Sequence, residues 1–396
     1  MKRKVLVMIS PVSAARMAGV ARYAREHNWH LMIQDRLGHR PLAWSGDGIV
    51  ATLRSDAASV ATIMKLKKRG IPVVDITMSR PDIKVPRVTS DHAEIGRMAA
   101  KHFAERNFRN VVWFSTGWGN VHALRYGGLT EKAPAGRWIV EEALPKARQN
   151  DWTAFLRFID RQLKEAPKPL AALTYDEADG ARLLDAAERL GVSVPEELAI
   201  LTVGNDPIIC ENQSVPLSSI DQDLERGGYE AAAMLDRLMD GERPPKEPVL
   251  VSPNGICLRR STDIMASSDP LVKKTLDYIA GHISTPIGAA QIADALHVSR
   301  NMLDKRFRAD LNRSIGTEIA RQRISMAKLM LRNSSMPIAK IARCAGFCTP
   351  SHLANAFRAA TGVSPRRFRS GDYPFFASKS FMKATSASTP SIGNAL

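Results

Sequence analysis

The sequence predicts an α/β domain followed by a smaller, basic, all-α domain. Residues 1–265 alternate short apolar runs with helical stretches, a pattern typical of parallel sheets covered by helices. Residues 271–370 contain 17 Lys and Arg against 5 Asp and Glu, so this quarter of the 396-residue chain carries most of the net charge of +16. Two segments of the basic region also repeat at a spacing of 49–50 residues.

Composition excludes several other classes of protein. No apolar run approaches the ~18 residues that span a bilayer, so we expect no membrane partner. The first apolar run starts at Val5 and ends before Ser10-Pro11. This run is shorter than the ~7–15 residues of a signal-peptide core. We therefore interpret it as a buried strand and expect a cytoplasmic protein. The cysteines are too few and too scattered for a disulfide framework: Cys210, Cys257, Cys344 and Cys348.

The α/β region contains seven predicted strands, Val5–Ile9, His30–Ile33, Gly48–Ala51, Val73–Ile76, Val111–Phe114, Leu170–Thr174 and Leu198–Val203. The helices between them end at residues that tolerate a left-handed backbone, Gly70, Asn107, Gly191 and Gly241. Ligands of such folds bind at the carboxyl ends of the strands. That edge contains Ser10, Arg54, Ser90-Asp91, Ser115–Trp118, Tyr175-Asp176 and Asn205-Asp206.

Each repeat in the basic region predicts a short helix, a tight turn and a second helix. Ser299 and Thr349 are N-cap residues for the second helices, and Gly346 supplies the positive φ of the second turn. The apolar pairs face the core at i, i+4 spacing: Leu303 with Phe307, and Leu353 with Phe357. A helix over 319–331 joins the two copies.

The opposite faces of the second helices carry polar and basic side chains. Asn301, Lys305 and Arg308 have counterparts 50 residues later in Ser351, Asn355 and Arg358. Amides and guanidinium groups on a capped helix suit the major groove of double-stranded DNA. Two rigidly joined copies would enter adjacent grooves about 34 Å apart. A merely solvated helix face is the alternative, and the repetition makes it the weaker one.

These residues resemble the AraC/XylS-type DNA-binding domain. The carrying motifs are Arg321-x-Arg323-x3-Ala327-x3-Leu331 and Ile341-Ala342-x3-Gly346-Phe347-x5-Leu353-x3-Phe357-x4-Gly362-x-Ser364-Pro365. The resemblance implies that exposed residues of both second helices contact DNA. The predicted DNA-binding set is Arg300, Asn301, Asp304, Lys305, Arg308, Pro350, Ser351, His352, Asn355 and Arg358.

The α/β region resembles the sugar-binding core of LacI/GalR repressors and periplasmic binding proteins. Matching motifs include Asp91-x4-Gly96-x2-Ala99-Ala100-x-His102, Arg125-x2-Gly128, Gly204-x-Asp206 and Pro216-Leu217-Ser218-Ser219-Ile220. The resemblance implies an α/β, periplasmic-binding-protein-like (type I), two-lobed sensor domain that also forms a homodimer. An all-α double helix-turn-helix DNA-binding domain follows it.

Three charged residues suit a polyol effector. Arg125 offers a fork of donors, and Asp176 and Asp206 accept from hydroxyl groups. Tyr175 and Trp118 are candidates for packing on a sugar ring, and Ser10 completes the predicted site. The alternatives are a surface role for Arg125, an N-cap for Asp176, a turn for Asp206 and core packing for the aromatic residues.

Catalytic and metal chemistry find no support in the sequence. No Walker A, H-E-x-x-H or G-x-S-x-G pattern occurs, and we predict no catalytic residue and no cofactor. Cys344, Cys348 and His352 have helical spacing, but Gly346 interrupts the helix between them. We therefore predict structural cysteines and no metal site.

Together these features predict a transcription regulator. Residues 1–265 would sense a small polar effector, by resemblance a monosaccharide, and residues 266–370 would bind DNA. Residues 371–396 read as a flexible tail. Activation of a sugar-catabolic operon, with RNA polymerase as a further partner, is the expected direction of control. The alternatives are a non-sugar ligand or no ligand, or an enzyme with a DNA-binding appendage.

Overall fold

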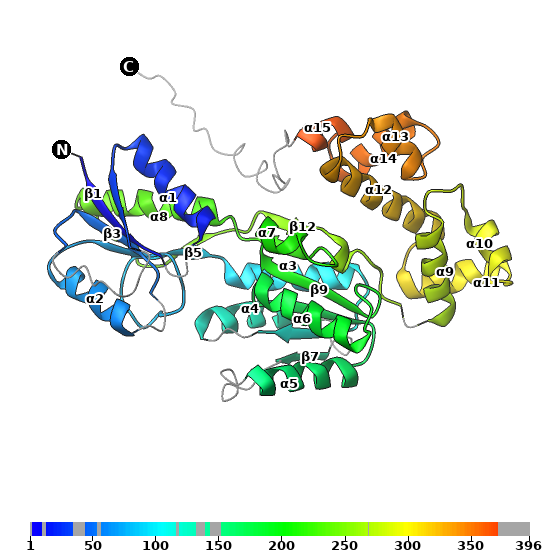
Figure 1. Cartoon of the computed structure of the whole chain (residues 1–396), viewed down its shortest axis with the longest axis horizontal. Coiled ribbons are helices and arrows are strands. Elements are labelled where there is room, and N and C mark those ends of the chain that lie inside the picture. The colour runs from blue at the N-terminus through cyan, green and yellow to red at the C-terminus, as the bar shows by residue number, and fades with distance from the viewer. Residues whose placement is uncertain are drawn as a thin grey trace, which may run out of the picture. The chain divides into compact units, whose positions relative to one another are not determined.

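The chain folds into an α/β unit and a helical unit, which divide between Pro270 and Leu271 (Figure 1). A computed structural model describes residues 2–9, 13–34, 44–53, 57–115, 119–131, 139–142, 152–267 and 269–370. The predicted tail, 371–396, lies outside the described residues. The order of elements confirms the predicted fold class, an α/β region followed by an all-α region.

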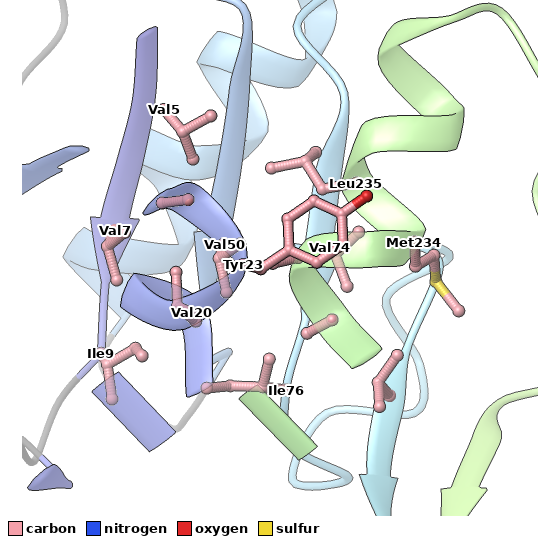
Figure 2. Packing of buried hydrophobic residues seen from close by; sticks show 14 of the residues in the cluster. Val5, Val7, Ile9, Val20, Tyr23, Val50, Val74, Ile76, Met234 and Leu235 are labelled. Carbon is pink, nitrogen blue, oxygen red and sulfur yellow. The ribbon is translucent and has the colours of Figure 1, made fainter. Parts of the chain in front are cut away.

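A four-stranded parallel sheet begins the first unit, in the order β2 (His30–Ile33), β1 (Lys4–Met8), β3 (Gly48–Ala51) and β4 (Val73–Asp75). Helices α1 (Ala14–Glu26) and α8 (Leu224–Met239) cover one face, and α2 (Ala57–Lys68) covers the other (Figure 1). Val5 and Val7 point to the first face (Figure 2). Leu6 packs in the core of the second face, so both faces are buried. Burial on both faces explains the continuous apolar runs of these strands.

A six-stranded sheet follows, in the order β12 (Gly255–Cys257), β10 (Ser218–Asp221), β9 (Leu198–Gly204), β8 (Leu170–Thr174), β6 (Asn110–Phe114) and β7 (Ile139–Glu142). All neighbours are parallel except β10 and β12. One face packs on α3 (His92–Glu105) and α4 (Asn120–Glu131), the other on α5 (Trp152–Glu165) and α6 (Glu177–Leu190). Short helices α7 (Pro207–Glu211) and η2 (Arg260–Thr262) lie near its ends.

Three segments cross between the two sheets, which makes the first unit two-lobed. They link β5 (Val88–Ser90) to α3, β10 to α8, and β11 (Val249–Val251) to β12, and β5 pairs with β11. The crossing segments also bond to one another. The Asp91 amide donates to the Val251 carbonyl at 2.9 Å, and the Asn254 amide donates to the Asp221 carbonyl at 2.9 Å. The two lobes are therefore joined by three crossing segments that are hydrogen-bonded to one another.

Glycines permit close contact between helices in each lobe. A Cβ on Gly96 of α3 would overlap the Arg125 carbonyl of α4, and one on Gly128 would overlap the Ala93 carbonyl. In the first lobe Gly19 and Gly228 allow the same approach between α1 and α8. The glycines of the motifs Asp91-x4-Gly96 and Arg125-x2-Gly128 thus have a packing role.

The helical unit contains two helix-turn-helix motifs. After α9 (Pro270–Gly281), the first consists of α10 (Ala289–Ala295) and α11 (Arg300–Leu311), and the second of α13 (Ile338–Cys344) and α14 (Pro350–Thr361). Helix α12 (Ile315–Asn333) joins them, and α15 (Pro365–Ser370) follows. The Ser299 and Thr349 hydroxyls cap α11 and α14, and both apolar pairs are fully buried, as predicted.

We expect Gly128→Ala to destabilise the first unit by about 1–3 kcal/mol, because its new Cβ would overlap the backbone of α3. Gly127→Ala is the matched control, since Gly127 is exposed in the same helix and its Cβ would meet nothing within 4 Å. The control should gain roughly 0.5–1 kcal/mol. Urea unfolding followed by tryptophan fluorescence measures both, and equal stabilities would refute the packing role.

Candidate functional site

Arg125 lies buried in α4, at the carboxyl end of the second sheet, so the alternative of a surface role is wrong. Its guanidinium group donates to three groups from different segments. Nε donates to Nδ1 of His92 at 3.3 Å, Nη1 to the Tyr175 carbonyl oxygen, and Nη2 to Oε1 of Gln222 at 3.1 Å. His92 begins α3 directly after one crossing segment, and Gln222 lies in another. One arginine therefore bonds to two of the three connections between the lobes.

His92 accepts this bond as a neutral imidazole. Burial, followed by the positive charge of Arg125, holds the pKa of His92 well below its ordinary value of 6.5. The Nδ1 atom accepts from Arg125, which assigns the ring hydrogen to Nε2, 3.4 Å from the Thr89 hydroxyl. Burial also lowers the pKa of Arg125, and the nearby Tyr175, Asp176 and Glu177 oppose that shift. Arg125 is thus a cation that the protein itself solvates.

Tyr175 and Asp176 follow β8 and lie beside Arg125. The guanidinium carbon of Arg125 lies 4.9 Å from the centre of the Tyr175 ring. The centre of the Trp113 ring lies 6.5 Å from the centre of the same tyrosine ring. Asp176 is the N-cap of α6, and its Oδ1 accepts from the Asp179 amide at 2.9 Å. The N-cap interpretation of Asp176 is confirmed, and its role as an effector ligand stays a prediction.

Asp206 is exposed and caps α7, where its Oδ1 accepts from the Ile208 amide at 2.9 Å. Its own amide donates to Oε1 of the buried Glu177 at 2.7 Å. Gly204, with φ of 138°, leaves room for that carboxyl group, because a Cβ there would overlap it. Burial raises the pKa of Glu177, the Asp206 hydrogen bond opposes the rise, and the charges of Asp176 and Asp206 add to it.

The structure brings together Arg125, Tyr175 and Asp176, and links Asp206 to them through Glu177. Ser10, Arg54 and Trp118 lie outside the described residues, so the structure does not place them. Sequence reasoning missed His92, Glu177 and Gln222. A signal existed for His92, which directly follows Ser90-Asp91 at the predicted ligand edge, whereas the strand before Gln222 was not predicted.

The predicted DNA-binding residues lie along two helix faces of the second unit. Each of them is exposed except Asp304, which is half-buried and forms an ion pair with Arg300 at 3.6 Å. Helix α11 presents Arg300, Asn301, Lys305 and Arg308, and α14 presents Pro350, Ser351, His352, Asn355 and Arg358. The His352 ring meets the edge of Phe347 at 5.4 Å. Their role on DNA stays a prediction.

Two further searches cover the described ranges alone. No helix there is long and apolar enough to cross a bilayer. No group of three or more His, Cys, Asp or Glu side chains in that part of the chain has a metal-binding arrangement. Helix α13 ends at Cys344, and Gly346 has φ of 77°, so the predicted interruption of the helix before Cys348 is confirmed.

Two domain families match the chain. Residues 100–262 match the periplasmic binding protein-like domain, and residues 292–371 match a helix-turn-helix domain. The two matches fall in the α/β unit and across the helical unit, respectively. They confirm the predicted order of a periplasmic-binding-protein-like region and a DNA-binding region.

Similar proteins extend the likeness along most of the chain. The xylose operon regulatory protein of Escherichia coli K12 is 26% identical over 366 residues, which cover 89% of this chain and 92% of that protein. The arabinose operon regulatory protein of the same organism is 34% identical over 121 residues, covering 29% and 41%. A solved xylose-binding transcription activator has the same fold, with a TM-score of 0.64 over 94% of this chain and 99% of that one, at 23% identity. These relatives are transcription regulators, which excludes the enzyme hypothesis.

We expect Glu177→Gln to raise the free energy of unfolding of the first unit at pH 8, with a smaller gain at pH 5. A carboxyl group with a raised pKa in the folded protein contributes its full stability below its ordinary pKa, 4.5, and loses it as the pH rises through the raised value. A neutral amide avoids that loss and still accepts from Asp206. Urea titrations at both pH values test this, with the exposed Glu165→Gln as the control. A gain that is independent of pH would contradict it.

Proposed function

We propose a monosaccharide of the xylose type as the effector of this chain, which is a DNA-binding transcription regulator with a periplasmic binding protein-like sensor region. The relatives named for xylose regulation support this assignment. We assign sensing and dimerisation to residues 1–265 and DNA binding to residues 266–370. In this proposal the protein acts in the cytoplasm as a homodimer, and it recruits RNA polymerase to activate a sugar-catabolic operon.

The observation that carries the proposal is the set of bonds made by Arg125. Its guanidinium group is the strongest donor in the predicted effector site, and it is bonded to His92 and Gln222 at the connections between the lobes. Adjacent sugar hydroxyls can accept from such a fork, while the free oxygens of Asp176 and Asp206 accept from the hydroxyl hydrogens. A polyol is the ligand class that uses both kinds of group together.

The proposed control step is an exchange of hydrogen bonds. A bound sugar would accept from Arg125 and release or redirect the bond to Gln222, which lies between β10 and α8. A ligand shifts a conformational equilibrium only by its difference in affinity for the two states. The exchange supplies that difference, because Arg125 contacts the lobe connections in one state and the effector in the other.

On DNA, we propose that α11 and α14 are recognition helices in adjacent major grooves. Arg and Lys contact guanine edges or phosphates, and Asn pairs with adenine. Asp304 is held by Arg300, and an aspartate there accepts from cytosine and repels phosphate. The side chains of α14 are mostly neutral, so this helix would contribute base choice more than charge.

We expect D-xylose to raise the melting temperature of the full-length protein in a thermal-shift panel of pentoses, hexoses, uronic acids and sugar phosphates. Stabilisation reaches about 2.7 kcal/mol at a hundredfold excess over Kd. Arg125→Gln should abolish the shift, whereas Arg189→Gln, an exposed arginine paired with Asp160, should keep it. A shift by a panel member other than xylose reassigns the effector. No shift at all would favour the alternative of a non-sugar ligand or none.

We expect Asn355→Ala and Arg358→Ala to weaken DNA binding in different ways. Loss of the Asn355 amide should relax base choice at one position by about 1–3 kcal/mol. Loss of the Arg358 cation should weaken binding to all sequences and reduce the salt slope by about one. Fluorescence anisotropy on cognate and mutated duplexes at several salt concentrations separates the two. Identical effects of both substitutions would refute the assignment of base-contacting residues.

A further inference from the structure

Arg323, in the middle of the joining helix α12, bonds to the loop that leads into the first helix-turn-helix motif. Its Nε donates to the Ile283 carbonyl at 3.2 Å, and its Nη2 donates to the Thr285 carbonyl at 2.8 Å. Both carbonyls belong to the loop that links α9 to α10. The side chain is partly buried, and a guanidinium group keeps its charge at neutral pH. Arg323 therefore ties the joining helix to the entry of the first motif.

The same loop also meets the turn of the second motif. A Cβ on Gly346 would overlap the Ile283 carbonyl oxygen and lie 2.7 Å from Nε of Arg323. The backbone of the second turn thus rests on both groups. In the first motif the equivalent position is His297, which has φ of 53° and still carries a side chain. A positive φ alone therefore does not require glycine at this position of the motif. The close contact with the Ile283 carbonyl explains why the second motif has glycine there.

We define Ile283, Thr285, Arg323 and Gly346 as the inter-motif contact. Helix α12 packs against α11 of the first motif and against α13 and α14 of the second. The inter-motif contact joins the entry of one motif directly to the turn of the other. It connects the two motifs by a route other than the length of α12.

We propose that Arg323, with Gly346, is a positioning residue that fixes the distance and rotation between α11 and α14, so that the protein selects DNA by the spacing of its two half-sites. One inserted base pair rotates a half-site by about one tenth of a helical turn. A rigid pair of recognition helices then loses the contacts of one helix, whereas a loosened pair adjusts. The inference rests on the proposed binding of both helices, and Arg323 itself does not touch DNA in it.

The test uses the full-length protein and a duplex that the protein itself selects from random DNA. Fluorescence anisotropy gives the affinity for that duplex and for one with a single base pair inserted between the half-sites. We expect the insertion to weaken wild-type binding by about 10–100-fold, the loss typical of a few missing base contacts. Arg323→Gln should reduce this ratio to about threefold, and Arg323→Lys, which keeps one cationic donor, should give an intermediate ratio.

Arg369→Gln is the matched control, because Arg369 of α15 also donates to a backbone carbonyl, that of Met336 before α13, and takes no part in the inter-motif contact. It should keep the wild-type ratio even if it lowers affinity. Gly346→Ala provides a second variant with the expected effect if Arg323→Gln fails to fold. A wild-type protein that ignores the insertion overturns both the two-helix binding mode and this inference. A discriminating wild type with an equally discriminating Arg323→Gln variant overturns the inference alone.

Discussion

The need to solvate one buried cation organises the first unit. Arg125 lies buried at the carboxyl end of the second sheet, where an unpaired charge would cost several kcal/mol. Its three acceptors come from the residue after β8, from the start of α3 and from a connection between the lobes. The glycine contact between α3 and α4 brings these segments close enough, and burial keeps His92 neutral so that it can accept.

This constraint gives the sensor region a defined resting state. The protein supplies acceptors to Arg125, and in the proposed mechanism an effector competes with them. Coupling between two ligand sites is commonly about 1–3 kcal/mol, which is the scale of one or two exchanged hydrogen bonds. The helical unit also uses an arginine that donates to several acceptors. Arg323 donates to two backbone carbonyls, and in our proposal these bonds fix the two motifs relative to each other. In both units an arginine fork joins segments that are distant in the chain.

Local signals predicted much of this fold, and long-range pairing accounts for what they missed. The seven predicted strands were found within about one residue of their observed ends, because strands buried on both faces show as continuous apolar runs. Strands β5, β7, β10, β11 and β12 were missed, since each is short and β10 begins with two serines. Without β10, Gln222 had no strand end to mark it. The burial of Glu177 was equally hidden, because it depends on the space left by Gly204. The Ser299 and Thr349 caps and the apolar pairs of α11 and α14 are local features, and these were predicted.

The proposed mechanism requires that a sugar bound at Arg125 changes the affinity of the protein for its operator DNA. The direct measurement is the affinity of the full-length protein for its operator duplex by fluorescence anisotropy, with and without saturating D-xylose. We expect the sugar to change Kd by about 5–150-fold in the wild type and to leave Kd unchanged in Arg125→Gln. An unchanged wild-type Kd, at a xylose concentration that calorimetry shows to be saturating, would contradict the account.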